Sequence, residues 1–173
     1  MSPRRPSTPE VYLPPAEDAP FNPRVPGIDY GVLDGLLGYA VRRAQIVQYE
    51  LFIAALTRWN ITPPRFSALV IISRNPSLKL TELANVLGIA RSGAVALINS
   101  LESMDYVRRV PCPTDKRALG LELTDQGRAD LDAIIAAVVE QDRRSGSALS
   151  ADEQAQLIAL LGKITTAGGA SAA

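Results

Sequence analysis

The sequence predicts a mainly α-helical protein with one small β-hairpin, and three observations carry this prediction. Apolar residues after position 29 recur at steps of three and four, the period of an amphipathic helix. A tight turn separates two helical stretches at 81–88 and 91–104. Two short stretches, 106–110 and 119–123, have the alternating pattern of half-buried strands and flank a polar turn.

Composition narrows the class of protein. The 173 residues are 47% apolar and 21% charged, with no net charge, which is typical of a globular protein. No apolar run reaches the roughly 20 residues of a membrane span, and the N-terminus lacks the apolar core of a signal peptide, so no membrane association is expected. The single cysteine, Cys112, excludes an internal disulfide and indicates a cytoplasmic protein.

The absence of histidine removes the commonest general base and the commonest metal ligand together. With one cysteine and no glycine-rich phosphate loop, the residues of a hydrolase or transferase are also missing. We therefore expect neither an enzyme nor a metal site, and no cofactor.

The ends of the chain differ from its middle. Eight of the 13 prolines lie within the first 26 residues, so 1–28 is expected to be an extended arm. The sequence AGGASAA predicts a disordered tail over 167–173. The folded domain should therefore occupy 29–166.

Long helices flank the central region. The helical period from Asp29 to Trp59 predicts one helix of roughly 30 residues, about 45 Å long at 1.5 Å per residue. A small domain does not need such a helix, so part of its apolar face should meet another chain. Thr124 should cap a second long helix over 125–144, and Ser150 with Glu153 fits the capping box of a last helix.

The central lobe, 62–123, begins with a helix signal at Thr62-Pro63, and that helix should stop near Asn75-Pro76. A very short strand candidate follows at 78–80. Thr81 should cap the next helix, and Gly88 suits its left-handed end. The following helix has an apolar face made of Ala94, Leu97, Ile98, Leu101 and Met104.

Helix, tight turn, helix and hairpin together form a winged helix-turn-helix, in which the second helix enters the major groove of DNA. The small residues on its exposed face allow close approach, and Arg91 and Asn99 suit contacts with guanine and adenine. Of the two neighbouring cations on the first strand, only one should face DNA, because strand side chains alternate. The candidate DNA contacts are Thr81, Arg91, Ser92, Gly93, Val95, Ala96, Asn99, Arg108, Lys116 and Arg117.

The turn Pro113–Arg117 is interpreted as a DNA probe. Arg117 suits a narrow minor groove and Lys116 suits a phosphate. Asp115 would be repelled by DNA, so it should support the wing by binding turn N–H groups or an arginine side chain. The segment 65–128 contains nine basic and six acidic residues, so this region has a net positive charge although the whole chain is neutral.

The sequence resembles the MarR (multiple antibiotic resistance regulator) family of winged-helix repressors. The resemblance covers about 29–165 and rests on segments such as "ITPPRFSALVII", "LTELANVLGIARSGAVALINSLESMDYVRR" and "PTDKRALGLELTDQGR". It implies an obligate homodimer joined through helices in 29–60 and 125–166, which binds double-stranded DNA at a pseudo-palindromic operator. One departure is Ala90, where relatives often place a capping Ser or Asp. Another is that the recognition face carries a single cation, so the wing should supply more of the affinity.

Many members of the family release DNA when a small ligand binds. The resemblance places the effector cavity between the dimerisation helices and the lobe, and aromatic and cationic side chains of that region suit an aromatic carboxylate or its coenzyme A thioester. Arg42 and Arg43 have an alternative interpretation as ion pairs across the dimer. The candidate effector residues are Tyr39, Arg42, Arg43, Tyr49, Trp59 and Phe66.

An alternative function stays open, because a winged helix need not bind DNA. The same dimer can serve as a protein–protein interaction module. The cations of the wing favour DNA, and binding to a duplex that depends on salt would decide between the two.

Overall fold

The computed structural model describes residues 21–112 and 115–170, with the backbone alone for 112, 115–118 and 167–170. The chain divides into two compact units, Met1–Leu51 and Phe52–Ala173, and each is described by itself. Of the expected arm, 1–20 lie outside the described residues, and 21–28 form no helix or strand.

The N-terminal helix is shorter than the sequence predicts. A 3₁₀ turn, Gly31–Gly35, precedes α1, Leu37–Ala55, which has 19 residues. Leu36 separates them with an extended backbone, φ −94° and ψ 118°. The prediction of one continuous helix of about 30 residues is therefore wrong, and glycines explain the break, since glycine favours helix least after proline. A second 3₁₀ turn, Thr57–Trp59, follows α1.

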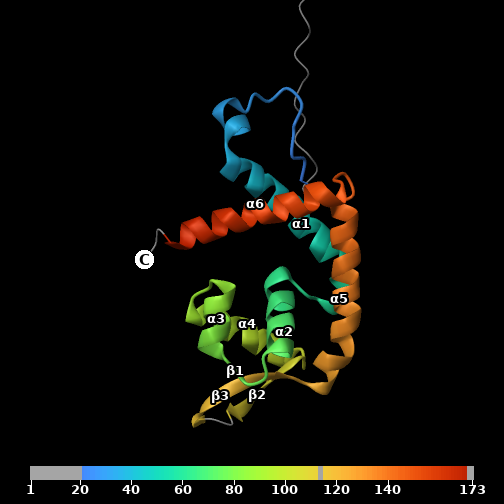
Figure 1. The fold of residues 1–173 in the computed structure, drawn as a ribbon. Coiled ribbons are helices and arrows are strands. Elements are labelled where there is room, and N and C mark those ends of the chain that lie inside the picture. Colours follow the sequence, from blue (N-terminus) through green and yellow to red (C-terminus); the bar gives the residue numbers. More distant parts are fainter. Residues whose placement is uncertain (1–20, 113–114, 171–173) are drawn as a thin grey trace, which may run out of the picture. The chain divides into compact units, whose positions relative to one another are not determined.

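The second unit contains the winged lobe (Figure 1). Helix α2 starts at Pro63, as expected from Thr62-Pro63. Its remaining elements follow in the predicted order. The lobe comprises α2 (Pro63–Arg74), β1 (Leu78–Lys79), α3 (Leu80–Leu87), α4 (Arg91–Ser103), β2 (Val107–Cys112) and β3 (Asp115–Leu123).

The sheet has three antiparallel strands in the order β1-β3-β2, so the predicted hairpin gains the short strand candidate at 78–80 as a third member. Val107 pairs with Leu123, and Leu78 pairs with Leu121 on the other side. Gly120 makes the close approach of β1 possible, because a Cβ there would lie 2.8 Å from the Cα of Ser77.

The hairpin turn is tighter than predicted. Residues 115–117 belong to β3 and not to the turn, because a register shift between Pro111 and Cys112 brings Cys112 opposite Asp115. Such a shift bends a strand locally and lets pairing continue beyond it. The residues between the two strands, 113–114, lie outside the described residues.

The core of this unit is apolar and draws on every element of the lobe. Leu83 of α3, Ile98 of α4 and Leu121 of β3 are almost completely buried, together with Leu69 of α2 and Ile134 of α5. Figure 1 places the strands at one end of the lobe, with α2, α3 and α4 beside them. Each side chain of this size contributes roughly 1.5–3 kcal/mol by leaving water.

Two helices complete the second unit. Helix α5, Asp125–Ser145, is capped by Thr124, whose hydroxyl accepts the N–H of Gly127 at 2.9 Å. Helix α6, Ala151–Ala170, starts with the predicted capping box, since the Ser150 N–H donates to Glu153 at 2.8 Å. Helix α6 continues through 167–170, where the sequence predicts a disordered tail. Residues 171–173 lie outside the description.

No single helix among the residues described is long and apolar enough to cross a membrane. Helices α3 and α4 pass that test only as a pair, and they are bent by 109° at their junction. The core positions of both helices are buried within the lobe.

Candidate DNA-binding interface

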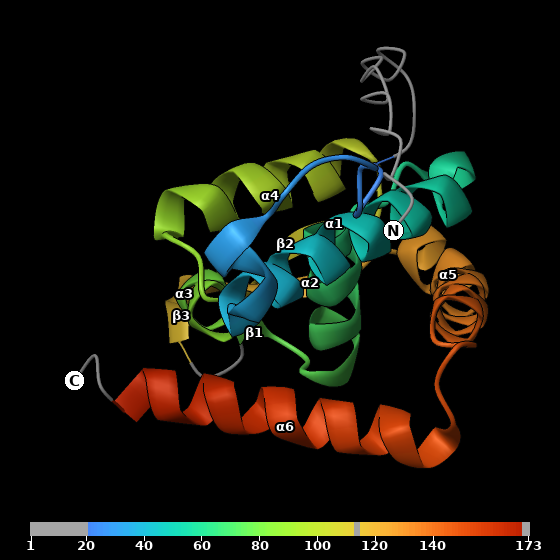
Figure 2. The same cartoon turned by 90° about the horizontal axis from the view of Figure 1, so that it is seen from above.

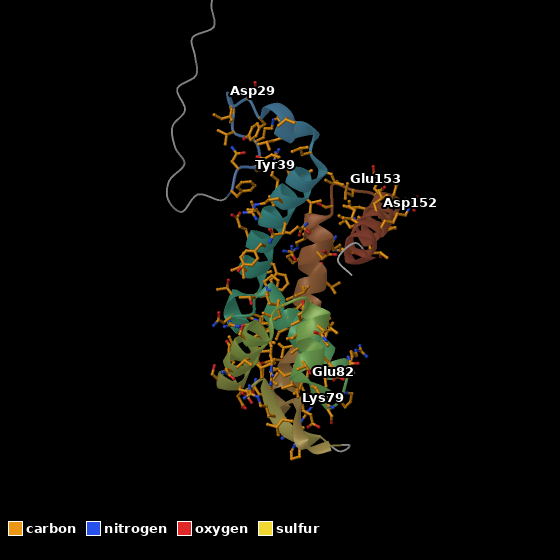
Figure 3. All side chains as sticks on the ribbon, turned by 90° about the vertical axis from the view of Figure 1, so that its left-hand side faces the viewer. Asp29, Tyr39, Lys79, Glu82, Asp152 and Glu153 are labelled. Atoms are coloured by element: carbon orange, nitrogen blue, oxygen red, sulfur yellow. The ribbon has the colours of Figure 1, made fainter. Side chains whose placement is uncertain are left out.

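The helix-turn-helix starts with a cap that the sequence does not reveal. The Lys79 N–H donates to the Glu82 carboxylate at 2.8 Å, and Figure 3 shows these two residues close together. Thr81 is therefore not the cap, as predicted, but the second residue of α3, where its side chain is exposed. Gly88 ends α3 in the left-handed conformation, with φ 63°, as expected.

Helix α4 is the recognition helix of this arrangement. The 109° between α3 and α4 lies within the usual range for a helix-turn-helix. Ala94, Ile98 and Leu101 anchor one face of α4 in the core, and Figure 2 shows the short connection from α3 to one end of α4. The six predicted contacts on the other face are all exposed: Arg91, Ser92, Gly93, Val95, Ala96 and Asn99.

The N-terminus of α4 is suited to an anion. Ala90 precedes the helix and provides no side-chain acceptor for the first N–H groups. These groups have no partner within the helix, and the helix dipole adds partial positive charge there. With the Ser92 hydroxyl and the Arg91 guanidinium nearby in sequence, a phosphate oxygen is the acceptor that fits this end.

The two arginines of β2 lie on opposite faces of the sheet. Arg108 forms an ion pair with Glu122, its cross-strand partner, at 3.4 Å. Arg109 turns toward α4, where its Nη1 donates to Glu102 at 2.5 Å and its Nη2 donates to the Oδ1 of Asn99 at 2.8 Å. Sequence reasoning named Arg108 as the DNA contact and missed that Arg109 joins the recognition helix. The alternation that places Arg109 on the same face as Val107 was the available signal.

The tip of the wing is described only in part. The backbones of Asp115, Lys116 and Arg117 continue β3, while their side chains lie outside the described part of the structure. Their predicted roles as support, phosphate contact and minor-groove contact therefore stay predictions.

The base of the wing is fixed to α5. The Tyr106 hydroxyl donates to Asp130 at 3.1 Å, and burial, followed by this hydrogen bond, raises the pKa of Tyr106. The backbone makes an even closer contact, because a Cβ on Gly127 would lie 2.2 Å from the Tyr106 carbonyl oxygen. Arg128 donates to the Leu123 carbonyl at 2.6 Å. Arg128 also lowers the pKa of Asp125, chiefly by a hydrogen bond to its carboxylate.

Arg65 holds α4 from another element. Its Nη2 donates to the Ser100 hydroxyl at 2.6 Å, and its Nη1 donates to the carbonyl of Asn60 at 2.6 Å. Asn60 itself takes the left-handed conformation, with φ 54°, after the 3₁₀ turn that follows α1. The recognition helix is therefore tied to the start of α2 independently of the sheet.

A second cluster lies in the N-terminal unit and contains two of the predicted effector residues. The Arg43 guanidinium lies 5.4 Å from the Tyr39 ring and 5.5 Å from the Tyr30 ring. Tyr30 was not predicted from the sequence. The Arg24 guanidinium also lies over its ring, 5.1 Å from the ring centre. The Nε of Arg43 is buried without a hydrogen-bond partner among the described residues. Figure 3 shows Tyr39 on α1 near this end of the chain.

A cavity of about 400 Å³ lies beside this cluster. Its lining is mostly apolar, with the Arg43 side chain as its only charged member. It is lined by Pro23, Ala40, Arg43, Ala44, Val47 and Gln48. Of the other predicted effector residues on α1, Arg42 and Tyr49 are exposed.

Trp59 and Phe66 have a structural role in the second unit. Both pack against its core, and Phe66 makes an edge contact with Phe52 at 5.8 Å between ring centroids. Arg58 lies over the Trp59 ring at 3.5 Å. Within the described ranges, no group of three or more His, Cys, Asp or Glu residues is arranged to hold a metal ion.

Comparison with known proteins finds similarity to transcriptional regulators. The model of the MarR family matches residues 61–119, which run from Ile61, just before α2, into β3. The putative transcriptional regulatory protein for the hcr operon of Thauera aromatica is 33% identical over 146 residues, which are 84% of this chain and 88% of that protein.

Solved structures match at similar levels. The transcriptional repressor CouR bound to a 23-mer DNA duplex has a TM-score of 0.76 and 35% identity, covering 80% of this chain and 98% of CouR. CouR bound to p-coumaroyl-CoA has a TM-score of 0.75 and 34% identity, covering 80% of this chain and 97% of that one.

Proposed function

The chain belongs to the MarR family of DNA-binding transcriptional regulators, and we propose that it is a homodimeric repressor released from a pseudo-palindromic operator by an aromatic effector. One observation carries the DNA-binding part. The exposed face of α4 combines small residues, Arg91 and an uncapped N-terminus, while its other face is fixed in the core. Repression of this kind would take place in the cytoplasm, where the chromosome is.

The homodimer is supported by apolar side chains that the single chain leaves exposed. They lie on the N-terminal segment, on α5 and on α6. Examples are Val32 and Leu37 of the N-terminal segment, Val139 of α5 and Ile158 of α6, which are 76%, 63%, 61% and 72% exposed. A second copy is the occupant that the family implies, and two recognition helices about 34 Å apart would then reach successive major grooves.

Duplex binding at several salt concentrations tests this function against the protein–protein module. The proposal expects affinity to fall with salt, because phosphate contacts release counterions. Arg91→Ala and Arg117→Ala should each weaken binding about tenfold with the dimer intact, which corresponds to about 1.4 kcal/mol. Arg143→Ala is the matched control, since Arg143 lies on α5 and pairs with Glu140. Salt-independent or absent duplex binding would favour the interaction module.

For the effector, we propose an aromatic acid in the form of its coenzyme A thioester. CouR, the similar repressor, has been solved with p-coumaroyl-CoA. In this chain, the cavity offers a mostly apolar lining and one cation, Arg43, whose guanidinium also lies against the rings of Tyr30 and Tyr39. An acyl group with a phenol ring suits that environment, and the buried Nε of Arg43 is a donor that lacks an acceptor.

The effector needs only modest coupling to release DNA. A ligand shifts an equilibrium by its difference in affinity for the two states, so a tenfold loss of operator affinity needs about 1.4 kcal/mol. Calorimetric titration with p-coumaroyl-CoA, free p-coumarate and acetyl-CoA should give binding by the first, weaker binding by the second and none by the third.

Paired variants locate the effector site. Arg43→Ala should lower the affinity for p-coumaroyl-CoA about tenfold or more, which is the loss of one charge-assisted hydrogen bond. Arg42→Ala changes the adjacent, exposed arginine and should leave the affinity within about twofold. Equal effects of the two substitutions would reject the cluster as the effector site.

A further inference from the structure

The side chain of Asn99 is held by the sheet on the exposed side of the recognition helix. Its Oδ1 accepts a hydrogen bond from Arg109 at 2.8 Å, while Arg109 is itself held by Glu102 at 2.5 Å. Arg109 and Glu102 are only about a third exposed, at 31% and 28%, so solvent screens this pair less than the open ion pairs of the chain. The three side chains form one network across β2 and α4.

We infer that Arg109 is a positioning residue that fixes the amide of Asn99 and thereby decides which base the recognition helix prefers. This inference rests on the proposal that α4 contacts DNA. An asparagine amide has one end that accepts and one end that donates, and a free exposed amide can turn either end outward. A guanidinium only donates, so Arg109 selects the orientation in which the Asn99 oxygen faces β2 and the amide NH₂ lies on the opposite side.

The orientation has a chemical consequence for readout. An NH₂ group presented to the major groove requires an acceptor, such as guanine N7 and O6, adenine N7 or thymine O4. The bidentate contact with adenine also needs the Asn oxygen, which here faces β2 and uses one of its two lone pairs for Arg109. Asn99 should therefore read a base as a donor and prefer positions that present an acceptor.

The charge of the network separates Arg109 from a phosphate contact. Glu102 neutralises Arg109 at 2.5 Å, and the other terminal nitrogen is directed to Asn99. A neutral pair releases few counterions, so the contribution of Arg109 to the salt dependence of binding should be small. Arg108, the preceding residue on the same strand, lies on the other face, is 54% exposed and pairs with Glu122 at the longer distance of 3.4 Å.

The position of α4 does not depend on Arg109 alone. Arg65 binds Ser100 at 2.6 Å from α2, and Ile98 and Leu101 are completely buried beneath the same turn of the helix. Loss of Arg109 should therefore free the Asn99 side chain while the helix backbone keeps its place. This separation allows the inference to be tested by base preference instead of by folding.

The test selects duplexes from a library with a randomised core, using full-length wild-type protein, Arg109→Ala, Asn99→Ala and the double variant. Arg109→Ala and Asn99→Ala should each reduce the preference at the same operator position by about fivefold or more. The double variant should show no further loss, because both substitutions remove one interaction. Arg143→Ala is the control, because Arg143 lies on α5 and pairs with Glu140, and it should leave the base preferences unchanged.

A second pair of variants gives the inference independent support. Asn99→Asp retains an acceptor for Arg109 but presents no donor, so the preferred base should shift toward one that donates, such as cytosine through N4. Arg109→Lys keeps the charge but has no planar fork to hold both partners, so its base profile should lie between those of wild type and Arg109→Ala. Thermal unfolding is measured for each variant. If Arg109→Ala does not fold, the base profile of Arg109→Lys is compared with that of wild type instead.

Two results would overturn the inference. One is a base profile of Arg109→Ala identical to that of wild type, and the other is a uniform loss of affinity at every operator position. Failure of the wild-type protein to select any duplex would instead contradict the proposed DNA-binding function, so the two failures are distinguishable.

Discussion

The winged lobe and the N-terminal unit are stabilised by different means. In the lobe, side chains of every element meet in one apolar core, and Leu83, Ile98 and Leu101 are completely buried. In the N-terminal unit, no described residue is buried. Its contacts include an exposed ion pair between Arg24 and Asp34 at 2.6 Å and the stacking of arginines on tyrosines.

This difference indicates which parts of the chain fix their own geometry. The lobe can present α4 to DNA at a set angle because packing and close backbone contacts hold it from within. The N-terminal unit leaves large apolar side chains exposed and one buried nitrogen without a partner. Its geometry should therefore depend on what binds it, which suits a region for which we propose both a dimer contact and the effector site.

The largest expected effect belongs to the joint between the wing and α5. Gly127→Ala places a Cβ 2.2 Å from the Tyr106 carbonyl oxygen, and backbone cannot yield as a flexible side chain can. We expect a loss of about 3 kcal/mol or more in the free energy of unfolding, measured by urea titration. Gly93→Ala is the control, because its Cβ would meet only Ile89 at 3.9 Å and should gain up to about 1 kcal/mol of helix stability.

The next largest effect is expected on dimer formation and not on the stability of the lobe. Leu37→Asp places a charge at an apolar position that is 63% exposed in the single chain. If a second copy covers this position, burying the charge weakens the dimer by about 2 kcal/mol or more, roughly thirtyfold in the dissociation constant. Analytical ultracentrifugation should detect monomer while circular dichroism retains the helical signal. An unchanged mass distribution would show that Leu37 lies outside the interface.

A smaller effect is expected at Tyr106. Tyr106→Phe removes the hydrogen bond to Asp130 and should cost about 1 kcal/mol of unfolding free energy. Burial raises the pKa of Tyr106 above its ordinary 10.0, so the unfolded chain loses this proton first as the pH rises. The stabilisation is therefore complete below about pH 10 and is lost as the pH rises through the higher pKa of the folded state. Melting curves between pH 8 and about 11.5 should be flatter for the variant than for wild type.

The smallest effect concerns the ion pair of the N-terminal unit. Asp34→Asn breaks the contact with Arg24, whose side chain is 62% exposed. Exposed pairs contribute little to stability, so the midpoint of global unfolding should not change measurably. Hydrogen exchange of the segment 24–35 should nevertheless become faster, because local opening needs no disruption of the core. A clear drop of the global midpoint would contradict the contrast between the two regions.

The sequence predicted the lobe well because its signals are local and repeated. Thr62-Pro63, Gly88 and Thr124 mark helix ends through their own backbone or side-chain chemistry, and all three are confirmed. The burial of Ala94 and Ile98 follows from the helical period.

The differences arise where distant or competing contacts decide. The apolar period predicted a continuous helix through Leu36, but periodicity does not register the loss of helix propensity from nearby glycines. Lys79 takes the N-cap position instead of Thr81, because its N–H group donates to the Glu82 carboxylate three residues later. Tyr30 was missed because its contact with Arg43 depends on how the segment before α1 folds back.

The sequence predicted which residues of the site are exposed, but it did not predict the hydrogen bonds that join Arg109 to Asn99 and Glu102. Strand alternation indicated that Arg108 and Arg109 face opposite sides, yet it could not say which one meets the recognition helix. The register of β2 against β3 and the position of α4 decide this, and both are tertiary properties.

The alanine before the recognition helix has a consequence for adaptation. A serine or aspartate at position 90 would cap α4 and raise the stability of the free protein. The same side chain would accept from the N–H groups that a phosphate needs, so the free protein would become more stable while the complex with the operator would lose phosphate contacts. Stability of the free protein and phosphate binding thus make opposite demands on this single position, and Ala90 leaves the first amides of α4 without a side-chain acceptor.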